Sequence, residues 1–117
     1  MTNPVIIYSP FSGHVVLEHF KQNKLESALF GKPDGDSVRR FCATFSDGHL
    51  AITGDIFAAT YSWRRDLSLC AFANISATRL AEKLSTRFIV GINKRSTLET
   101  HADALRHLSD ALIRGKM

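Results

Sequence analysis

The sequence has little that could cross-link the chain or anchor it in a membrane. It contains only two cysteines and three prolines in 117 residues. No apolar run approaches the roughly 20 residues needed to span a bilayer, and the N-terminus lacks the basic region and long apolar stretch of a signal peptide. We therefore expect a cytoplasmic protein with no membrane contact. Cys42 and Cys70 are expected to be small buried hydrophobic residues, with a bridge between them as the alternative.

Motifs for metal binding, phosphate binding and catalysis are also missing. The five histidines show no HExxH or HxH spacing, no CxxC pair exists, and the glycines form neither a GxGxxG nor a Walker pattern. We expect no metal, no cofactor and no catalytic residues. A small enzyme built around Cys42, His49 or Asp55 is the least favoured hypothesis, because catalysis needs such groups to converge in one cleft.

Length and composition indicate one globular domain over residues 1–117. Hydrophobic residues make up 44% of the chain and charged residues 22%, which is ordinary for a globular protein. A chain of this length buries a core without needing disulfides or metals.

Alternating apolar residues predict a β-meander in the middle of the chain. The first strand is expected over 38–45, with Phe41, Ala43 and Phe45 on one face. Asp47-Gly48 is a strong hairpin signal, because glycine accepts the positive φ that a tight turn requires. A third strand is expected over 56–61, and a further strand over 5–8 could join the sheet at an edge.

Helical periodicity is expected on both sides of the meander. Before it, spaced apolar residues predict a broken helix or helix–turn–helix over 13–30. After it we expect a short helix over 67–73 and a longer one that Ser76 caps. Residues 88–92 are apolar and could form a strand or a packed loop.

The last helix has the clearest signal. Ser96-Thr-Leu-Glu99 is a capping box, in which serine and glutamate satisfy each other's backbone donors. One apolar stripe follows: Leu98, Ala102, Leu105, Leu108 and Leu112. The whole pattern predicts an α+β fold, a small antiparallel β-meander of three to four strands covered by two or three helices.

The positive charge is concentrated in one segment. The chain carries a net charge of +4. Residues 60–95 contain seven lysines and arginines against two acidic residues, whereas the segments on either side are close to neutral. Such a segment attracts anionic partners; the alternative is a solvated face that keeps the protein soluble.

Aromatic and arginine residues stand together just after the third predicted strand. Trp63, Arg64 and Arg65 belong to the residue types that most often anchor interfaces. Lys94 and Arg95 would extend the positive surface if the fold brings the two loops together. We therefore predict a partner-binding surface made of these five residues, with burial of Trp63 in the core as the alternative.

Two short segments carry a family resemblance. Leu50, Ile52, Thr53, Gly54 and Asp55, followed by Leu80-Ala-Glu-Lys-Leu84, resemble small uncharacterised phage and prophage proteins. Those proteins share a segment like G-x-L-x-[IV]-T/S-G-D, then an aromatic strand, then a helix that reads like x-W-A-E-K-L. The matched region spans about 38–84. It leaves out the N-terminal third and the last helix, and Ile56-Phe57 stand where the family favours tryptophan or glycine.

The resemblance implies origin more than activity. Small phage proteins of this kind often bind and block host machinery, including CRISPR surveillance complexes. The leading hypothesis is therefore a non-enzymatic, anti-CRISPR-like inhibitor that binds a host protein complex such as a CRISPR effector. The alternative is a nucleic-acid-binding accessory or regulatory protein, whose affinity would fall steeply with salt. No pattern in the sequence selects an oligomeric state.

Overall fold

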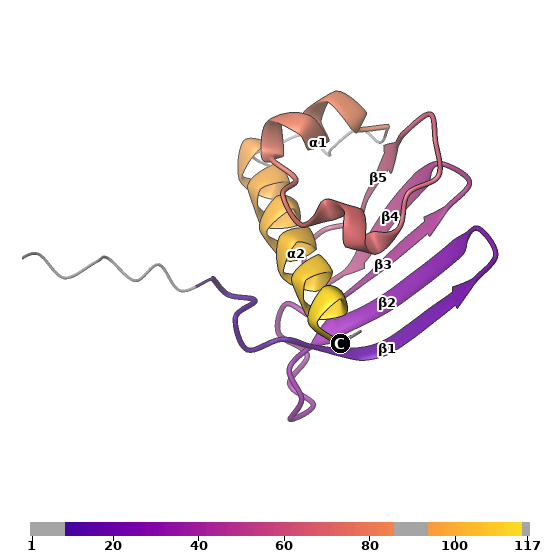
Figure 1. The fold of residues 1–117 in the computed structure, drawn as a ribbon. Helices are drawn as coiled ribbons and strands as arrows, with labels where there is room; N and C mark the ends of the chain where they lie inside the picture. Colours follow the sequence, from indigo (N-terminus) through magenta and orange to yellow (C-terminus); the bar gives the residue numbers. More distant parts are fainter. Residues whose placement is uncertain (1–8, 86–93, 116–117) are drawn as a thin grey trace, which may run out of the picture.

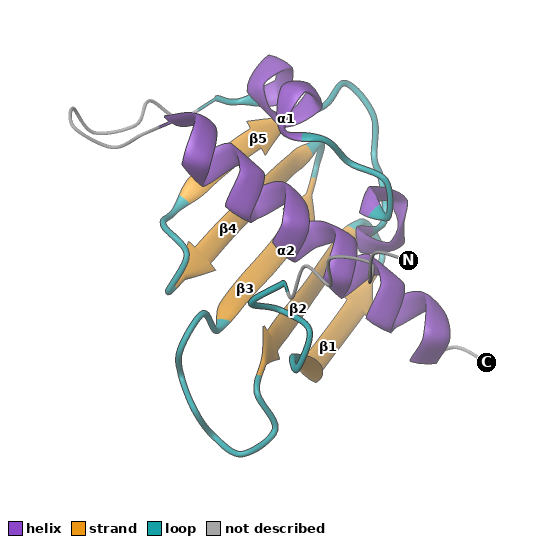
Figure 2. Ribbon diagram, turned by 90° about the vertical axis from the view of Figure 1, so that its left-hand side faces the viewer, coloured by secondary structure: helices purple, strands orange, loops and turns teal. Residues whose placement is uncertain are grey.

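The computed structural model describes residues 9–85 and 94–115. They form an α+β fold, in which all the helices lie on one side of a five-stranded sheet (Figure 1, Figure 2). The predicted fold class is confirmed, with one strand more than the upper end of the prediction. The strand expected over 5–8 and the apolar run 88–92 lie outside the described residues.

The sheet is a simple meander, in which each strand pairs antiparallel with the next in the order β1-β2-β3-β4-β5. The strands are β1 (Val15–Gln22), β2 (Leu25–Gly31), β3 (Phe41–Ser46), β4 (His49–Gly54) and β5 (Ala59–Ser62). The predicted hairpin at Asp47-Gly48 joins β3 to β4, and both residues have positive φ, 53° and 79°.

The prediction of a broken helix over 13–30 is wrong, because this region forms the β1–β2 hairpin. Its turn contains Asn23, which adopts a φ of 55° and takes the place that glycine usually fills. In β2 the inward-facing positions are Glu26, Ala28 and Phe30. The period of two is hidden in the sequence because a glutamate occupies one of these three inward-facing positions.

The helices are η1 (Leu69–Phe72), α1 (Ala77–Lys83) and α2 (Lys94–Gly115). The helix expected over 67–73 is only one 3₁₀ turn. Ser76 caps α1 as predicted, since its hydroxyl accepts a 3.1 Å hydrogen bond from the Arg79 amide. The prediction of a capping box at Ser96 is wrong. The helix α2 begins two residues earlier, at Lys94, and the Glu99 carboxylate forms an ion pair with Arg95 instead.

The core lies between one face of the sheet and α2 (Figure 2). The predicted apolar stripe of the last helix is buried at every position. The sheet contributes alternate residues, among them Phe41, Ala43 and Phe45, which share the inner face as predicted. No helix in 9–85 or 94–115 is long and apolar enough to cross a bilayer. Cys42 and Cys70 are free thiols, each partly buried.

Candidate functional site: the basic end of the sheet

The predicted binding residues Trp63, Arg64 and Arg65 lie in the loop between β5 and η1. The Trp63 amide donates a 2.7 Å hydrogen bond to the Gly48 carbonyl. The loop therefore continues the β5 edge for one residue and sits against the β3–β4 hairpin. Both arginines are exposed.

Trp63 is partly buried, and its ring holds the loop to the core. The ring lies 6.1 Å from Phe45 and 5.2 Å from Phe72, centroid to centroid. Trp63 thus combines the two roles weighed from the sequence: it packs on the core and leaves the neighbouring arginines facing solvent.

Gly48 is required for this arrangement on two grounds. Its φ of +79° is a conformation that other residues rarely adopt. In addition, a Cβ atom at this position would lie 2.7 Å from the Trp63 carbonyl oxygen. The close approach of two backbones therefore fixes where the arginine loop begins.

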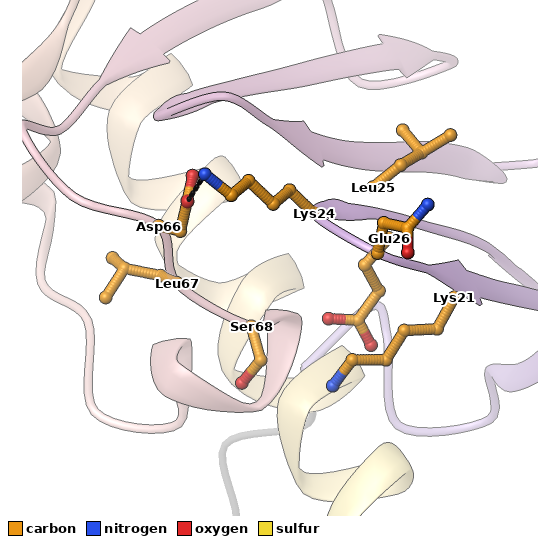
Figure 3. A pocket seen from close by; sticks show the side chains of 8 residues that line it. Lys21, Lys24, Leu25, Glu26, Asp66, Leu67 and Ser68 are labelled. Carbon is orange, nitrogen blue, oxygen red and sulfur yellow. Dashed lines mark ion pairs between the residues drawn. The ribbon is translucent and has the colours of Figure 1, made fainter.

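Two lysines of the β1–β2 hairpin join the arginine loop at the same end of the sheet. The Lys24 ammonium lies 3.6 Å from the Asp66 carboxylate, an ion pair marked by the dashed line in Figure 3. Lys21 and Lys24 line one hollow of about 200 Å³ together with the loop residues Asp66, Leu67 and Ser68 (Figure 3). We call Lys21, Lys24, Arg64 and Arg65 the basic end.

A buried carboxylate fastens the two parts of this hollow together. Glu26 is only 3% exposed. One of its oxygens accepts a 2.7 Å hydrogen bond from the Leu69 amide, and the other lies 2.7 Å from His19 Nε2. Because Glu26 belongs to β2 and Leu69 begins η1, this side chain ties the end of the arginine loop to the hairpin.

Two other cations of the basic segment are paired with neighbouring carboxylates, whereas most cations of the basic end are not. Arg79 pairs with Glu82 at 3.0 Å, and Arg95 pairs with Glu99 at 3.1 Å. By contrast, no described carboxylate forms an ion pair with Lys21, Arg64 or Arg65. Two exposed aspartates, Asp47 and Asp66, lie among the four cations.

The structure does not bring Arg95 to the other predicted site residues. His101, in the second turn after Arg95, bonds through Nε2 to the Ile56 carbonyl oxygen at 2.7 Å. The first part of α2 therefore lies by the β4–β5 loop, at the opposite end of β4 from Gly48. Lys94 is the first residue of α2, and its side chain lies outside the described part.

The residues weighed for catalysis do not converge. Cys42 lies opposite Thr53 and His49 opposite Ser46, so the two are separated along β4 by four residues, about 13 Å of strand. The Asp55 carboxylate is already engaged, because it accepts a 2.8 Å hydrogen bond from the Arg39 backbone amide. Among the described residues, no group of three or more His, Cys, Asp or Glu could hold a metal ion.

Sequence reasoning missed Lys21 and Lys24, because both stand in the region predicted as helix. The signal that could have found them is Asn23, a residue that tolerates positive φ between two short apolar stretches.

The chain matches no protein family, no curated protein and no solved structure.

Proposed function

We propose that this protein acts by binding, and that its basic end docks on an acidic surface of a protein partner. The observation that carries the proposal is the convergence of four exposed cations from the β1–β2 hairpin and from the loop after β5, with Lys24 alone paired within the described residues. Charge complementarity between such a cluster and an acidic patch gives electrostatic steering and specificity.

The pattern of charge favours a protein over a nucleic acid. A nucleic acid offers a uniform row of phosphates, which the interspersed Asp47 and Asp66 would repel. Single-stranded nucleic acid is also usually held by exposed aromatic rings, whereas the Trp63 ring packs against Phe45 and Phe72. A protein surface can match a mosaic of both signs.

The resemblance of 47–55 and 77–84 to small phage proteins supports a more specific partner. In this proposal the acidic surface belongs to a host defence complex, a CRISPR effector above all, and the protein inhibits it by occupying that surface. Co-expression with the effector in a plasmid-interference assay tests this part. Inhibition that survives reversal of both arginines to glutamate would contradict it.

The only tryptophan of the chain is a built-in reporter of binding, because Trp63 adjoins Arg64. Titration with a glutamate-rich peptide, followed by its fluorescence, should show saturable binding. The double variant Arg64→Glu/Arg65→Glu should lose this binding. A matched control, Arg79→Glu/Arg114→Glu, changes the net charge equally at exposed positions elsewhere and should keep it.

The same titration with a short DNA duplex separates the two partner classes. We expect weaker binding to the duplex than to the acidic peptide at equal salt. Preferential binding to the duplex, lost steeply as salt rises, would replace the proposed function with nucleic-acid binding. If both double variants lose binding equally, the net charge of the protein explains the binding, and the basic end is not the binding site.

A further inference from the structure

The two edges of the sheet are protected very differently. The short edge strand β5 is covered after α1, where Leu84 forms a bridge with Tyr61 and the Ser85 amide donates to the Thr60 carbonyl at 2.8 Å. The eight-residue strand β1 pairs with β2 on one side, and no described strand pairs with its outer side. An exposed edge of this kind offers unpaired backbone groups to another chain.

Exposed apolar side chains gather beside the open edge. Val15, Leu17 and Phe20 belong to β1, and Leu25 starts the adjacent strand. Phe20 is 50% exposed and lies opposite Ser27, on the face of the sheet turned away from the helices. These exposed apolar side chains beside β1 favour a partner that pairs with this edge of the sheet.

The strands farther from β1 present a different surface on that face. On β3, β4 and β5 the outward side chains are mainly small or hydroxyl-bearing: Cys42, Thr44, Ala51, Thr53 and Thr60. A body stacked over the middle of the sheet would therefore bury few large apolar groups. The position of the apolar residues selects the edge over the open face.

A second copy of this chain fits the regular part of the edge. A bulge separates Val16 from Glu18, so the regular stretch runs from Glu18 to Gln22 and is centred on Phe20. In an antiparallel pair with a two-fold axis at Phe20, Glu18 lies opposite Gln22 of the second copy and His19 opposite Lys21. The two Phe20 rings then meet across the axis.

Charge also fits this pairing. The His19 ring lies 2.7 Å from the Glu26 carboxylate. Lys21 of one copy would therefore approach an imidazole–carboxylate pair of the other, and no two like-charged side chains face each other directly. A two-fold axis at Glu18 would instead set two glutamates opposite one another, which is unfavourable.

We propose that β1 is a dimerisation edge, through which two copies form one continuous ten-stranded sheet about an axis at Phe20. Pairing over such a short stretch covers less than the roughly 800 Å² per partner of a standard interface. We therefore expect a reversible dimer with a Kd of about 10–100 µM. The dimer does not use Arg64 or Arg65, although it shares Lys21 with the basic end.

Sedimentation equilibrium over about 5–500 µM protein tests the proposal across the expected Kd. The average mass should rise from 13.0 kDa toward twice that value. Phe20→Lys should keep the protein monomeric, since it places two cations on the axis. The control Phe57→Lys replaces a similarly exposed ring, 57% accessible and away from β1, and should dimerise like the parent chain.

A crosslink tests the register. In a background with Cys42→Ser and Cys70→Ser, Phe20→Cys should form a disulfide-linked dimer on mild oxidation, and Gln22→Cys should form far less. A monomer throughout the concentration range would overturn the proposal. If the Phe20→Lys variant dimerises like the parent chain, the assignment of the interface to β1 is wrong. If Gln22→Cys crosslinks faster than Phe20→Cys, the proposed register is wrong. Loss of peptide binding in the arginine variants with dimerisation intact would separate this result from the proposed function.

Discussion

The Tyr61 hydroxyl donates a 2.7 Å hydrogen bond to His101 Nδ1 in the core between β5 and α2. The direction follows from the other ring nitrogen. His101 Nε2 lies 2.7 Å from the Ile56 carbonyl oxygen and 3.0 Å from that of Phe57, so Nε2 carries the proton and Nδ1 accepts. A neutral imidazole thus joins the last helix to β5 and to the β4–β5 loop.

Burial lowers the pKa of His101, although its hydrogen bonds to the two carbonyl groups oppose this shift in part. Burial also raises the pKa of Tyr61, which keeps the hydroxyl protonated as the donor. The folded protein therefore holds fewer protons than the unfolded chain in the range just below the ordinary histidine pKa of about 6.5. Stability from this site is present above that pH and is lost as the pH falls through it.

The first prediction is a fall in the free energy of unfolding on acidification. Between about pH 7.5 and about pH 5 the parent chain should lose stability, because His101 binds a proton in the unfolded chain but stays neutral in the folded protein. Urea unfolding followed by circular dichroism measures this. In His101→Gln, which is neutral at every pH, the fall should be smaller, while His49→Gln at an exposed position should retain it. An equal pH dependence in the parent chain and His101→Gln would contradict the assignment.

The second prediction isolates the close approach at Gly48. Gly35 and Gly48 both have positive φ, +88° and +79°, but only Gly48 would bring a Cβ against the Trp63 carbonyl oxygen. Gly35→Ala should cost about 1 kcal/mol from backbone strain. Gly48→Ala should cost about 2–4 kcal/mol, since steric overlap is added to the strain. Urea midpoints of the two variants test this; equal losses would mean that the contact with Trp63 is loose.

The third prediction concerns the carboxylate that fastens η1 to the hairpin. Glu26→Ala leaves the Leu69 amide without its acceptor in a buried site, which should cost about 2–4 kcal/mol. The Leu69 amide should also exchange faster with solvent, a local effect that hydrogen exchange detects. The control is Glu82→Ala on the surface of α1, which should change stability by less than about 1 kcal/mol. Unchanged exchange at Leu69 would show that other contacts hold the loop.

The elements that the sequence predicts correctly are those whose local signals agree with their tertiary contacts. Phe41, Ala43 and Phe45 alternate with partly buried residues and precede an Asp-Gly turn, so both the strand and its hairpin are recognisable. The stripe of α2 repeats at helical spacing because one face of this helix packs along the whole sheet.

The errors have a physical cause as well. In β1 and β2, the apolar residues Leu17, Phe20, Leu25 and Leu29 stand three to five residues apart, which imitates one side of a helix. They lie instead on the outer face of two strands, while Glu26 takes a buried position through hydrogen bonds that no local pattern reveals. The same error hid Lys21 and Lys24, so half of the basic end depends on a hairpin that periodicity did not predict.

In the proposed function, Lys21, Lys24, Arg64 and Arg65 form one binding surface although they are distant in sequence. Amide chemical-shift mapping of the ¹⁵N-labelled protein with a glutamate-rich peptide tests it most directly. We expect perturbations at the two hairpin turns and in the loop that follows β5, with α1 and the first turn of α2 unaffected. Perturbations centred on Arg79 and Arg95, or spread evenly over all exposed cations, would contradict it.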